Sequence, residues 1–360
     1  MRLIRTARIK GGEMLDDANV LKQRDAKGAL DVAAALFEQT KFDVQLRDAD
    51  HDNRKINQIV IAGMGGSALA ADLAKSLLAE VIDVPLEVIK GYELPLYVGK
   101  HTLVITSSHS GNTEETVACL EQAIAQKAQV AATATGGQLD EISEANSIMF
   151  AHMPHDTQPR MAVIYNLRSI IRILVEFGMV KQSFYDEITS TAEWLGEESA
   201  RWCKDVPTKL NYAKQLALLA VGKTPIFYSG SLMAPVAYKW KISWNENAKN
   251  VAFWNYLPEF NHNEFLGWTS HPIEKPFVIF DLVSEFEHPR VLKRFSLTDK
   301  LLSGKRPKAN IIPLAGESVM EQTLWACILA DFVSIYVAIL NGVDPTQVDL
   351  IEKFKKELVS

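Results

Sequence analysis

Short apolar runs alternate with helix-patterned segments along the first half of this chain, and this alternation constrains its fold more than any other feature. The apolar runs lie at 58–62, 86–90, 102–105, 130–134 and 148–150, and helical periodicity marks 115–125 and 139–145. Strands that are buried on both faces read as continuous apolar runs, and parallel neighbours need a crossover helix. The pattern therefore predicts an α/β fold with a parallel sheet covered by helices.

The second half of the chain repeats the pattern weakly. At 225–237 an apolar run again meets a glycine-serine turn and a helix, and further apolar runs lie at 277–280 and 310–313. A chain of 360 residues also exceeds the usual size of one core. We therefore expect two similar α/β subdomains. The predicted divisions are an N-terminal arm at 1–25, a first subdomain at 26–180, a helical linker at 181–207 and a second subdomain at 208–360.

Charge and cysteine content narrow the functional classes. A net charge of -6 argues against nucleic-acid binding. The start of the chain lacks the apolar core of a signal peptide, and the apolar segment at 327–340 is broken by Asp331 and Ser334, so no membrane span is expected. The three cysteines are scattered, which indicates free thiols and a cytoplasmic protein; they are Cys119, Cys203 and Cys327.

The segment 106–113 follows an apolar run, precedes a helical segment and carries five hydroxyl side chains. The first N–H groups of a helix have no partner within it, and the helix dipole favours an anion there. One hypothesis is a phosphate cradle that uses Ser108, Ser110 and Thr113. The alternative is ordinary N-capping by the same residue types, and the segment alone leaves both open.

A glycine-rich turn at 63–68 follows the run at 58–62 and raises a nucleotide-binding alternative. A dinucleotide site wants an acidic residue at the end of the second strand, where this chain has Lys90. The Gly-Lys-Ser/Thr of a P-loop is absent from the sequence. Gly66 and Ser67 are therefore interpreted as a second set of anion donors at a helix start.

Three further polar residues are candidates for chemistry. Glu246 lies between two asparagines near a probable helix end and close to three lysines, a setting suited to a general base or to a plain helix terminus. His262 also lies between two asparagines, and it either takes a fixed orientation or merely belongs to a turn. Arg160 opens a helical segment, where the dipole disfavours a cation. His152 and His155 lack the partners of a metal site, and none is predicted.

Taken together, these motifs resemble the sugar isomerase (SIS) domain and, more specifically, the bifunctional phosphoglucose/phosphomannose isomerases. The resemblance rests on Gly63-Met64-Gly65-Gly66-Ser67, the serine motif at 108–115, Asn245-Glu246-Asn247-Ala248-Lys249 and Pro258-Glu259-Phe260-Asn261-His262-Asn263. It implies two flavodoxin-like SIS subdomains, each a three-layer αβα sandwich with a parallel sheet. It further implies a homodimer with a shared active site.

The resemblance also implies an activity, which is the cofactor-free interconversion of glucose 6-phosphate and mannose 6-phosphate with fructose 6-phosphate through a cis-enediol(ate). By this likeness Ser108, Ser110 and Thr113 hold the phosphate, and Gly66 and Ser67 line the site. Arg160 stabilises the enediolate. Glu246 moves the proton between C1 and C2. His262, typically supplied by the neighbouring subunit, opens the sugar ring.

A C-terminal lysine completes the family's site, and three candidates lie on the helical segment at 348–358. Lys355 borders its apolar face and fits the family pattern best, while Lys353 and Lys356 remain open. His109 departs from the family, which usually has an aromatic such as Tyr there. The alternative function is a non-catalytic sugar-phosphate sensor, although no output module is apparent in the sequence. Another SIS isomerase or aminosugar enzyme fits the two asparagine motifs less well.

Overall fold

The computed structural model describes residues 10–270 and 276–358, and this part of the chain forms two compact units. One unit is Leu36–Trp194, and the other combines Met1–Ala35 with Leu195–Ser360. These divisions differ from the predicted ones, since the start of the chain belongs with the C-terminal half. The boundary near residue 194 falls within the segment predicted as a helical linker, where α8 (Gln182–Ser190) and α9 (Ala192–Ala200) lie.

The unit Leu36–Trp194 is built on a six-stranded sheet in the order β1-β6-β5-β4-β2-β3. The parallel strands are β2 (Gln58–Gly63), β3 (Leu86–Ile89), β4 (Thr102–Ser107), β5 (Gln129–Ala134) and β6 (Met149–His152). All five were predicted from their apolar runs. The short β1 (Leu46–Arg47), which pairs antiparallel with β6, was not predicted, because two residues carry no periodicity.

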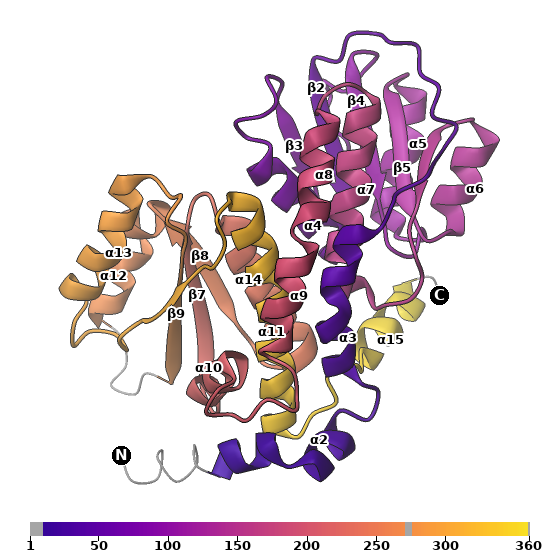
Figure 1. Ribbon diagram of the computed structural model, residues 1–360. Coiled ribbons are helices and arrows are strands. Elements are labelled where there is room, and N and C mark those ends of the chain that lie inside the picture. Colours follow the sequence, from indigo (N-terminus) through magenta and orange to yellow (C-terminus); the bar gives the residue numbers. More distant parts are fainter. Residues whose placement is uncertain (1–9, 271–275, 359–360) are drawn as a thin grey trace. The chain divides into compact units, whose positions relative to one another are not determined.

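Helices cover both faces of this sheet. On one face α4 (Gly65–Leu77) packs against α7 (Val163–Glu176), and on the other α5 (Glu114–Ala125) lies beside α6 (Gly137–Ala145) (Figure 1). The short helix η1 (Leu36–Lys41) packs on α7. Strands β2 and β4 are buried almost throughout, which explains why they read as unbroken apolar runs.

The other unit has a four-stranded parallel sheet in the order β10-β9-β7-β8. Its strands are β7 (Thr224–Gly230), β8 (Phe253–Leu257), β9 (Phe277–Val283) and β10 (Asn310–Pro313). Strand β8 was missed because its residues are mostly half-buried and lack a clear apolar run. The helices α11 (Ala234–Ala248) and α14 (Val319–Asn341) pack together on one face. Right-handed connections place α12 (Glu264–Gly267) and α13 (Pro289–Leu301) on the other.

Helix α14 is long and apolar enough to cross a membrane by composition, yet 94% of its most apolar window is buried inside the unit. It packs against α10 (Tyr212–Ala220), α11 and α3 (Ala29–Ala35). The apolar segment at 327–340 was expected to fall short of a membrane span, because Asp331 and Ser334 interrupt it. Since Asp331 is buried and ion-paired, the helix continues past it as the central core helix of its unit.

Residues 10–24 were predicted to belong to a loose arm, but they are helical from 10 to 16 and in α2 (Ala18–Arg24). Leu15 and Leu21 are buried, and the Arg24 guanidinium donates a 2.6 Å hydrogen bond to the Ile339 carbonyl at the end of α14. The side chain of Asp17 caps α2 and separates the two short helices. Each helix is too short to show amphipathic periodicity, so the sequence pattern failed there.

Candidate active site

The first sheet changes direction between β2 and β4. The chain moves from β2 outward to β3 on one side, and from β4 outward to β5 and β6 on the other. Gly63 and Ser107, the last residues of the two strands, lie opposite each other in the parallel register. A reversal of strand order opens a crevice beyond the carboxyl ends of the strands, where α/β proteins bind ligands. Both predicted anion loops start from this point.

Gly66 and Ser67 lie in the first turn of α4 and are buried. Within the described chain, no side chain caps the amides of this helix, since Met64 occupies the N-cap position. A Cβ atom on Gly66 would lie only 2.7 Å from the carbonyl oxygen of Pro159. The glycine therefore allows the helix start to approach the turn that carries Arg160.

The serine loop at 108–113 is tied together by its own hydroxyl groups. Ser108 Oγ and Thr113 Oγ1 share a 2.7 Å hydrogen bond, and the amide of Gly111 donates to Ser108 Oγ at 3.2 Å. Thr113 is the N-cap residue of α5, yet its side chain caps no amide of the described helix. Ser110 is exposed at the tip of the loop. The N-capping alternative is thus not what these hydroxyls do, and the arrangement favours the anion cradle.

Gly111 shows why this loop has its shape. Its φ is +72°, and a Cβ atom there would lie 1.7 Å from the Gly136 carbonyl oxygen on the loop after β5. The amide of Gln138 donates to the Asn112 side chain at 3.0 Å, and the amide of Leu139 donates to the Gly111 carbonyl at 3.0 Å. These contacts fasten the serine loop to the start of α6, so it presents its hydroxyls from a rigid base.

Arg160 lies in the short helix η2 (Pro159–Met161) and is only 3% exposed. A buried glutamine on η1 fixes the turn around it. The Gln39 amide donates to the Met161 carbonyl at 2.8 Å, and its oxygen accepts from the Tyr165 amide at 3.3 Å. The role of Gln39 was not predicted, because no local pattern links it to a residue more than 120 positions later.

In the other unit, Glu246 lies half-buried near the end of α11. Lys239, Ser243 and Asn247 recur every four residues and form a polar stripe on the face of α11 that meets α14. Lys239 Nζ contacts the Asp331 carboxylate at 2.7 and 2.9 Å, Ser243 Oγ donates to the same carboxylate at 2.8 Å, and the Asn247 amide donates to Ser334 Oγ at 2.9 Å. The stripe fixes the rotation of α11 and so the direction in which Glu246 leaves it.

Two details of the expected Glu246 environment need correction. Lys239 was grouped with the lysines near this carboxylate, but it is buried against Asp331. The flanking amides, which were expected to support Glu246, have other partners: Asn245 donates to the Asn250 carbonyl at 2.9 Å and Asn247 to α14. Lys249 does remain close, because its Nζ donates to the Glu246 carbonyl at 2.5 Å.

His262 lies at the end of η3 (Glu259–His262), which follows β8, and its ring is exposed. The asparagines on either side hold the turn. The Asn261 amide donates to Thr298 Oγ1 on α13 at 2.9 Å, and the Asn263 amide donates to Glu259 Oε1 at 2.6 Å. The conformation of the turn is therefore fixed by its neighbours, while the imidazole itself stays accessible.

The two glycine-serine turns were predicted to be similar. They share the same strand–turn–helix backbone, but the second turn is not available to an external anion. The turn after β7 lies at the point where the second sheet changes direction, yet the buried carboxylate of Glu287 occupies it. Glu287 accepts from the amides of Met233 at 3.1 Å and Leu232 at 3.3 Å, and a Cβ atom on Gly230 would lie 2.1 Å from its carboxyl carbon. An internal anion thus fills the second crevice.

The six predicted binding residues, Gly66, Ser67, Ser108, Ser110, Thr113 and Arg160, all lie in the unit Leu36–Trp194, and the three predicted catalytic residues lie in the other. Lys355 is part of α15 (Asp349–Leu358), but its side chain and that of Lys356 lie outside the described residues. Lys353 is exposed and lies 3.7 Å from Glu357. Sequence likeness to the family pattern therefore remains the basis for choosing Lys355.

Other features of the described residues do not suggest a second reaction centre. Over residues 10–270 and 276–358, no group of three or more His, Cys, Asp or Glu side chains is placed to hold a metal ion. The three cysteines are free, as predicted, and burial raises the pKa of Cys119 to about 11 and that of Cys327 to about 12. Thiols with such pKa values are poor nucleophiles.

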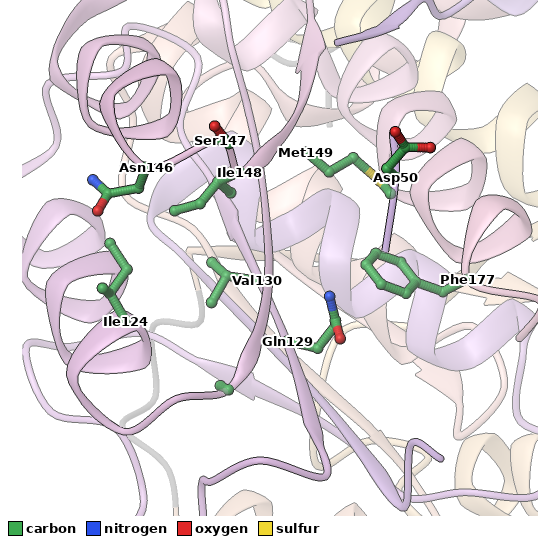
Figure 2. A pocket seen from close by; sticks show the side chains of 10 residues that line it. Asp50, Ile124, Gln129, Val130, Asn146, Ser147, Ile148, Met149 and Phe177 are labelled. Atoms are coloured by element: carbon green, nitrogen blue, oxygen red, sulfur yellow. The ribbon is translucent and has the colours of Figure 1, made fainter. Parts of the chain in front are cut away.

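A hollow of about 220 Å³ lies at the opposite edge of the first sheet, where β5 and β6 begin (Figure 2). Its lining includes Gln129 and Met149 from the strand starts, Asn146 from the end of α6, and Asp50 and Phe177. Helix carboxyl ends and an aspartate make this a poor setting for a phosphate group. Because the hollow lies where β5 and β6 begin, it is separate from the anion loops, which follow the carboxyl ends of the strands.

Comparison with known proteins agrees with this architecture. The family model of the SIS domain matches residues 54–175, and that of the bacterial phospho-glucose isomerase C-terminal SIS domain matches 209–358. Among solved structures, the fold resembles a glucose-6-phosphate isomerase like protein from Thermus thermophilus, with a TM-score of 0.62 and 19% identity, over 94% of this chain and 99% of that one. The expectation of two SIS subdomains with parallel sheets is confirmed.

Sequence comparison identifies the family more closely. The chain is 35% identical over 305 residues to a bifunctional phosphoglucose/phosphomannose isomerase from Caldicellulosiruptor bescii, covering 84% of this chain and 90% of that protein. It is 33% identical over 301 residues to the same enzyme from Aquifex aeolicus, with coverage of 83% and 90%. A D-glucosamine-6-phosphate 4-epimerase from Sulfolobus acidocaldarius is 32% identical over 58% of this chain and 62% of its own length. This chain is an aldose–ketose isomerase and belongs to the bifunctional phosphoglucose/phosphomannose isomerase family.

Proposed function

We propose that the enzyme interconverts glucose 6-phosphate and mannose 6-phosphate with fructose 6-phosphate without a cofactor. The observation that carries the proposal is the serine loop, whose hydroxyls gather at the crevice of the first sheet beside helix amides that no described side chain caps. Neutral hydroxyl and amide donors suit a phosphate dianion, and a helix N-terminus adds favourable electrostatics. The second crevice is filled by Glu287, so one phosphate site per chain is expected.

In the proposed mechanism, Ser108, Ser110 and Thr113 bind the phosphate, with Gly66 and Ser67 lining the site. His262 assists ring opening by proton transfer at the ring oxygen. Glu246 then removes the proton from C2 of the open aldose and returns it to C1, which yields the ketose through a cis-enediol(ate). Arg160 stabilises the negative charge that develops on the enediolate oxygens. We assign Lys355 to the sugar end of the site.

Both six-carbon aldoses fit this mechanism, because they differ only in configuration at C2 and give the same enediol. An enzyme that tolerates either configuration at C2 acts on both, and Glu246 would approach the same carbon in each case. We further propose a cytoplasmic homodimer in which His262 reaches the site of the neighbouring subunit. The His262 side chain is exposed, and hydrogen bonds from Asn261 and Asn263 hold its turn in place, which supports a role at the site of a neighbouring subunit.

The test is formation of fructose 6-phosphate from each aldose phosphate by the wild type, with and without chelator, and by Glu246→Gln. Loss of a positioned acid/base group costs roughly 10²–10⁴-fold in rate, so we expect at least that loss in kcat. Glu121→Gln, on an exposed position of α5, is the matched control and should keep full activity. Unchanged turnover in Glu246→Gln, or tight sugar-phosphate binding without turnover by the wild type, would refute the proposal; the latter result would favour a sensor.

A further inference from the structure

His109 lies inside the serine loop, but its side chain points away from solvent and takes no part in the hydroxyl network. It is 5% exposed, and among the described residues neither ring nitrogen has a hydrogen-bond partner of normal geometry. Its ring stacks on that of His155, with centroids 6.0 Å apart and planes inclined by 23°. Two positively charged imidazoles in contact would repel each other. Stacking of two histidine rings at a phosphate loop is therefore sensitive to charge.

The stack joins two segments that matter for the substrate. His109 belongs to the loop expected to bind phosphate, and His155 belongs to the segment that leads into Arg160. Thr135 bridges them a second time, since its amide donates to the His109 carbonyl at 2.9 Å and its hydroxyl lies 3.3 Å from His155 Nδ1. The segment is also anchored to α7, where the Tyr165 hydroxyl donates to Asp156 at 3.1 Å. Separation of the two rings would therefore remove one of the contacts that tie these two segments together.

Several groups around His109 decide its protonation. Burial lowers the pKa of its imidazole, and the neighbouring His155 lowers it further, while the Thr157 backbone and the Asp156 carboxylate act in the opposite direction. The net effect is a lowered pKa for His109, so its imidazole is neutral at pH 8. Its protonation on acidification would place a buried charge beside a second imidazole, which favours separation of the rings.

We propose that the stack of His109 on His155 is a positioning clamp, which holds the phosphate loop and the Arg160 segment in one arrangement. The inference rests on the proposed function, because it assumes that these two segments bind the two ends of one substrate. His109 acts through the loop and does not touch the substrate. A different role, direct contact of a cationic His109 with phosphate, predicts the opposite response to acid.

The experiment measures kcat and KM for fructose 6-phosphate between pH 8 and pH 5.5 in the wild type, His109→Phe, His155→Phe and His109→Ala. The stacking of an aromatic pair stabilises a conformation by roughly a two- to tenfold change in its equilibrium constant. We expect the wild-type KM to rise by that factor on acidification relative to His109→Phe, which stacks without titrating. In His109→Ala the KM should already be raised at pH 8. Any pH response of the rest of the site is common to all variants and cancels in the ratio.

A wild-type KM that falls on acidification relative to His109→Phe would overturn the clamp in favour of a cationic phosphate contact. Equal pH profiles in all four proteins would overturn it as well. His155→Phe changes an exposed ring and so serves as the second variant if substitution at the buried His109 prevents folding.

Hydrogen exchange separates this inference from the proposed function. Amide protection at 108–113 and 153–160 should drop at pH 5.5 in the wild type but not in His109→Phe. This measurement needs no turnover, so absence of isomerase activity would refute the proposed function alone. Protection that is independent of pH in the wild type would refute the clamp even in an active enzyme.

Discussion

The buried ion pair between Lys239 and Asp331 makes the sharpest energetic prediction of the structure. The two side chains are 1% and 2% exposed, and their contacts are 2.7 and 2.9 Å long. Asp331 also accepts from Ser243 at 2.8 Å. Removal of one partner takes away the opposite charge that stabilises the other in the core, which costs about 3–5 kcal/mol. We therefore expect Asp331→Asn to destabilise the unit that contains α11 and α14 by about that amount.

Replacement of both partners tests the reasoning more strictly. In Lys239→Met combined with Asp331→Leu, both charges of the pair are removed together, and apolar replacements of similar volume are often neutral or stabilising. The double variant should therefore be much more stable than Asp331→Asn. Its kcat should still fall if the polar stripe sets the direction of Glu246, because the contact that aligns α11 with α14 is lost.

Urea unfolding followed by tryptophan fluorescence is the appropriate assay. All of the seven tryptophans except Trp194 lie in the affected unit, so the signal reports on that unit. A loss below about 1 kcal/mol in Asp331→Asn would refute the argument, since surface ion pairs contribute no more than that. If the double variant is as unstable as Asp331→Asn, the loss of stability comes from the missing ion pair itself. It then does not come from a buried charge whose opposite charge was removed.

Three further predictions concern other sites. Gly66→Ala places a Cβ atom 2.7 Å from the Pro159 carbonyl oxygen, an overpacking worth about 1–3 kcal/mol, so kcat/KM should fall at least tenfold in the isomerase assay. Glu287→Gln loses one of two backbone hydrogen bonds and should destabilise its unit by about 1–3 kcal/mol in urea unfolding. Burial raises the pKa of Asp281 to about 7, so wild-type stability should decline between about pH 4 and pH 7, and Asp281→Asn should be the more stable protein at pH 8.

Each of these predictions has a control. Gly91→Ala adds a methyl group in open space and should leave kcat/KM unchanged. Glu285→Gln, on an exposed position two residues before Glu287, should not change the unfolding midpoint measurably. For Asp281 the sign follows from proton uptake: the folded state binds more protons than the unfolded chain between the two pKa values, so stability is greatest in acid. A wild-type curve that rises across this window would contradict the assignment.

Local patterns were sufficient for much of the architecture. The strands β2, β3, β4, β5 and β6 were predicted because buried parallel strands appear as unbroken apolar runs. The serine loop was predicted because hydroxyls between a strand and a helix form a short continuous motif. Strand β8 and the helices before Asp25 were missed, since half-buried residues and very short helices leave no clear period.

The sequence by itself determined the two α/β units, the hydroxyl loop and the identity of Glu246 and His262 as candidates, because each depends on residues close together in the chain. Only the tertiary structure decided which partners the polar groups chose. It paired Lys239 with Asp331, placed Gln39 behind the Arg160 turn, filled the second crevice with Glu287 and stacked His109 on His155. The physical reason is that a buried polar group must find a partner in space, and the fold, not the local sequence, determines which groups become neighbours.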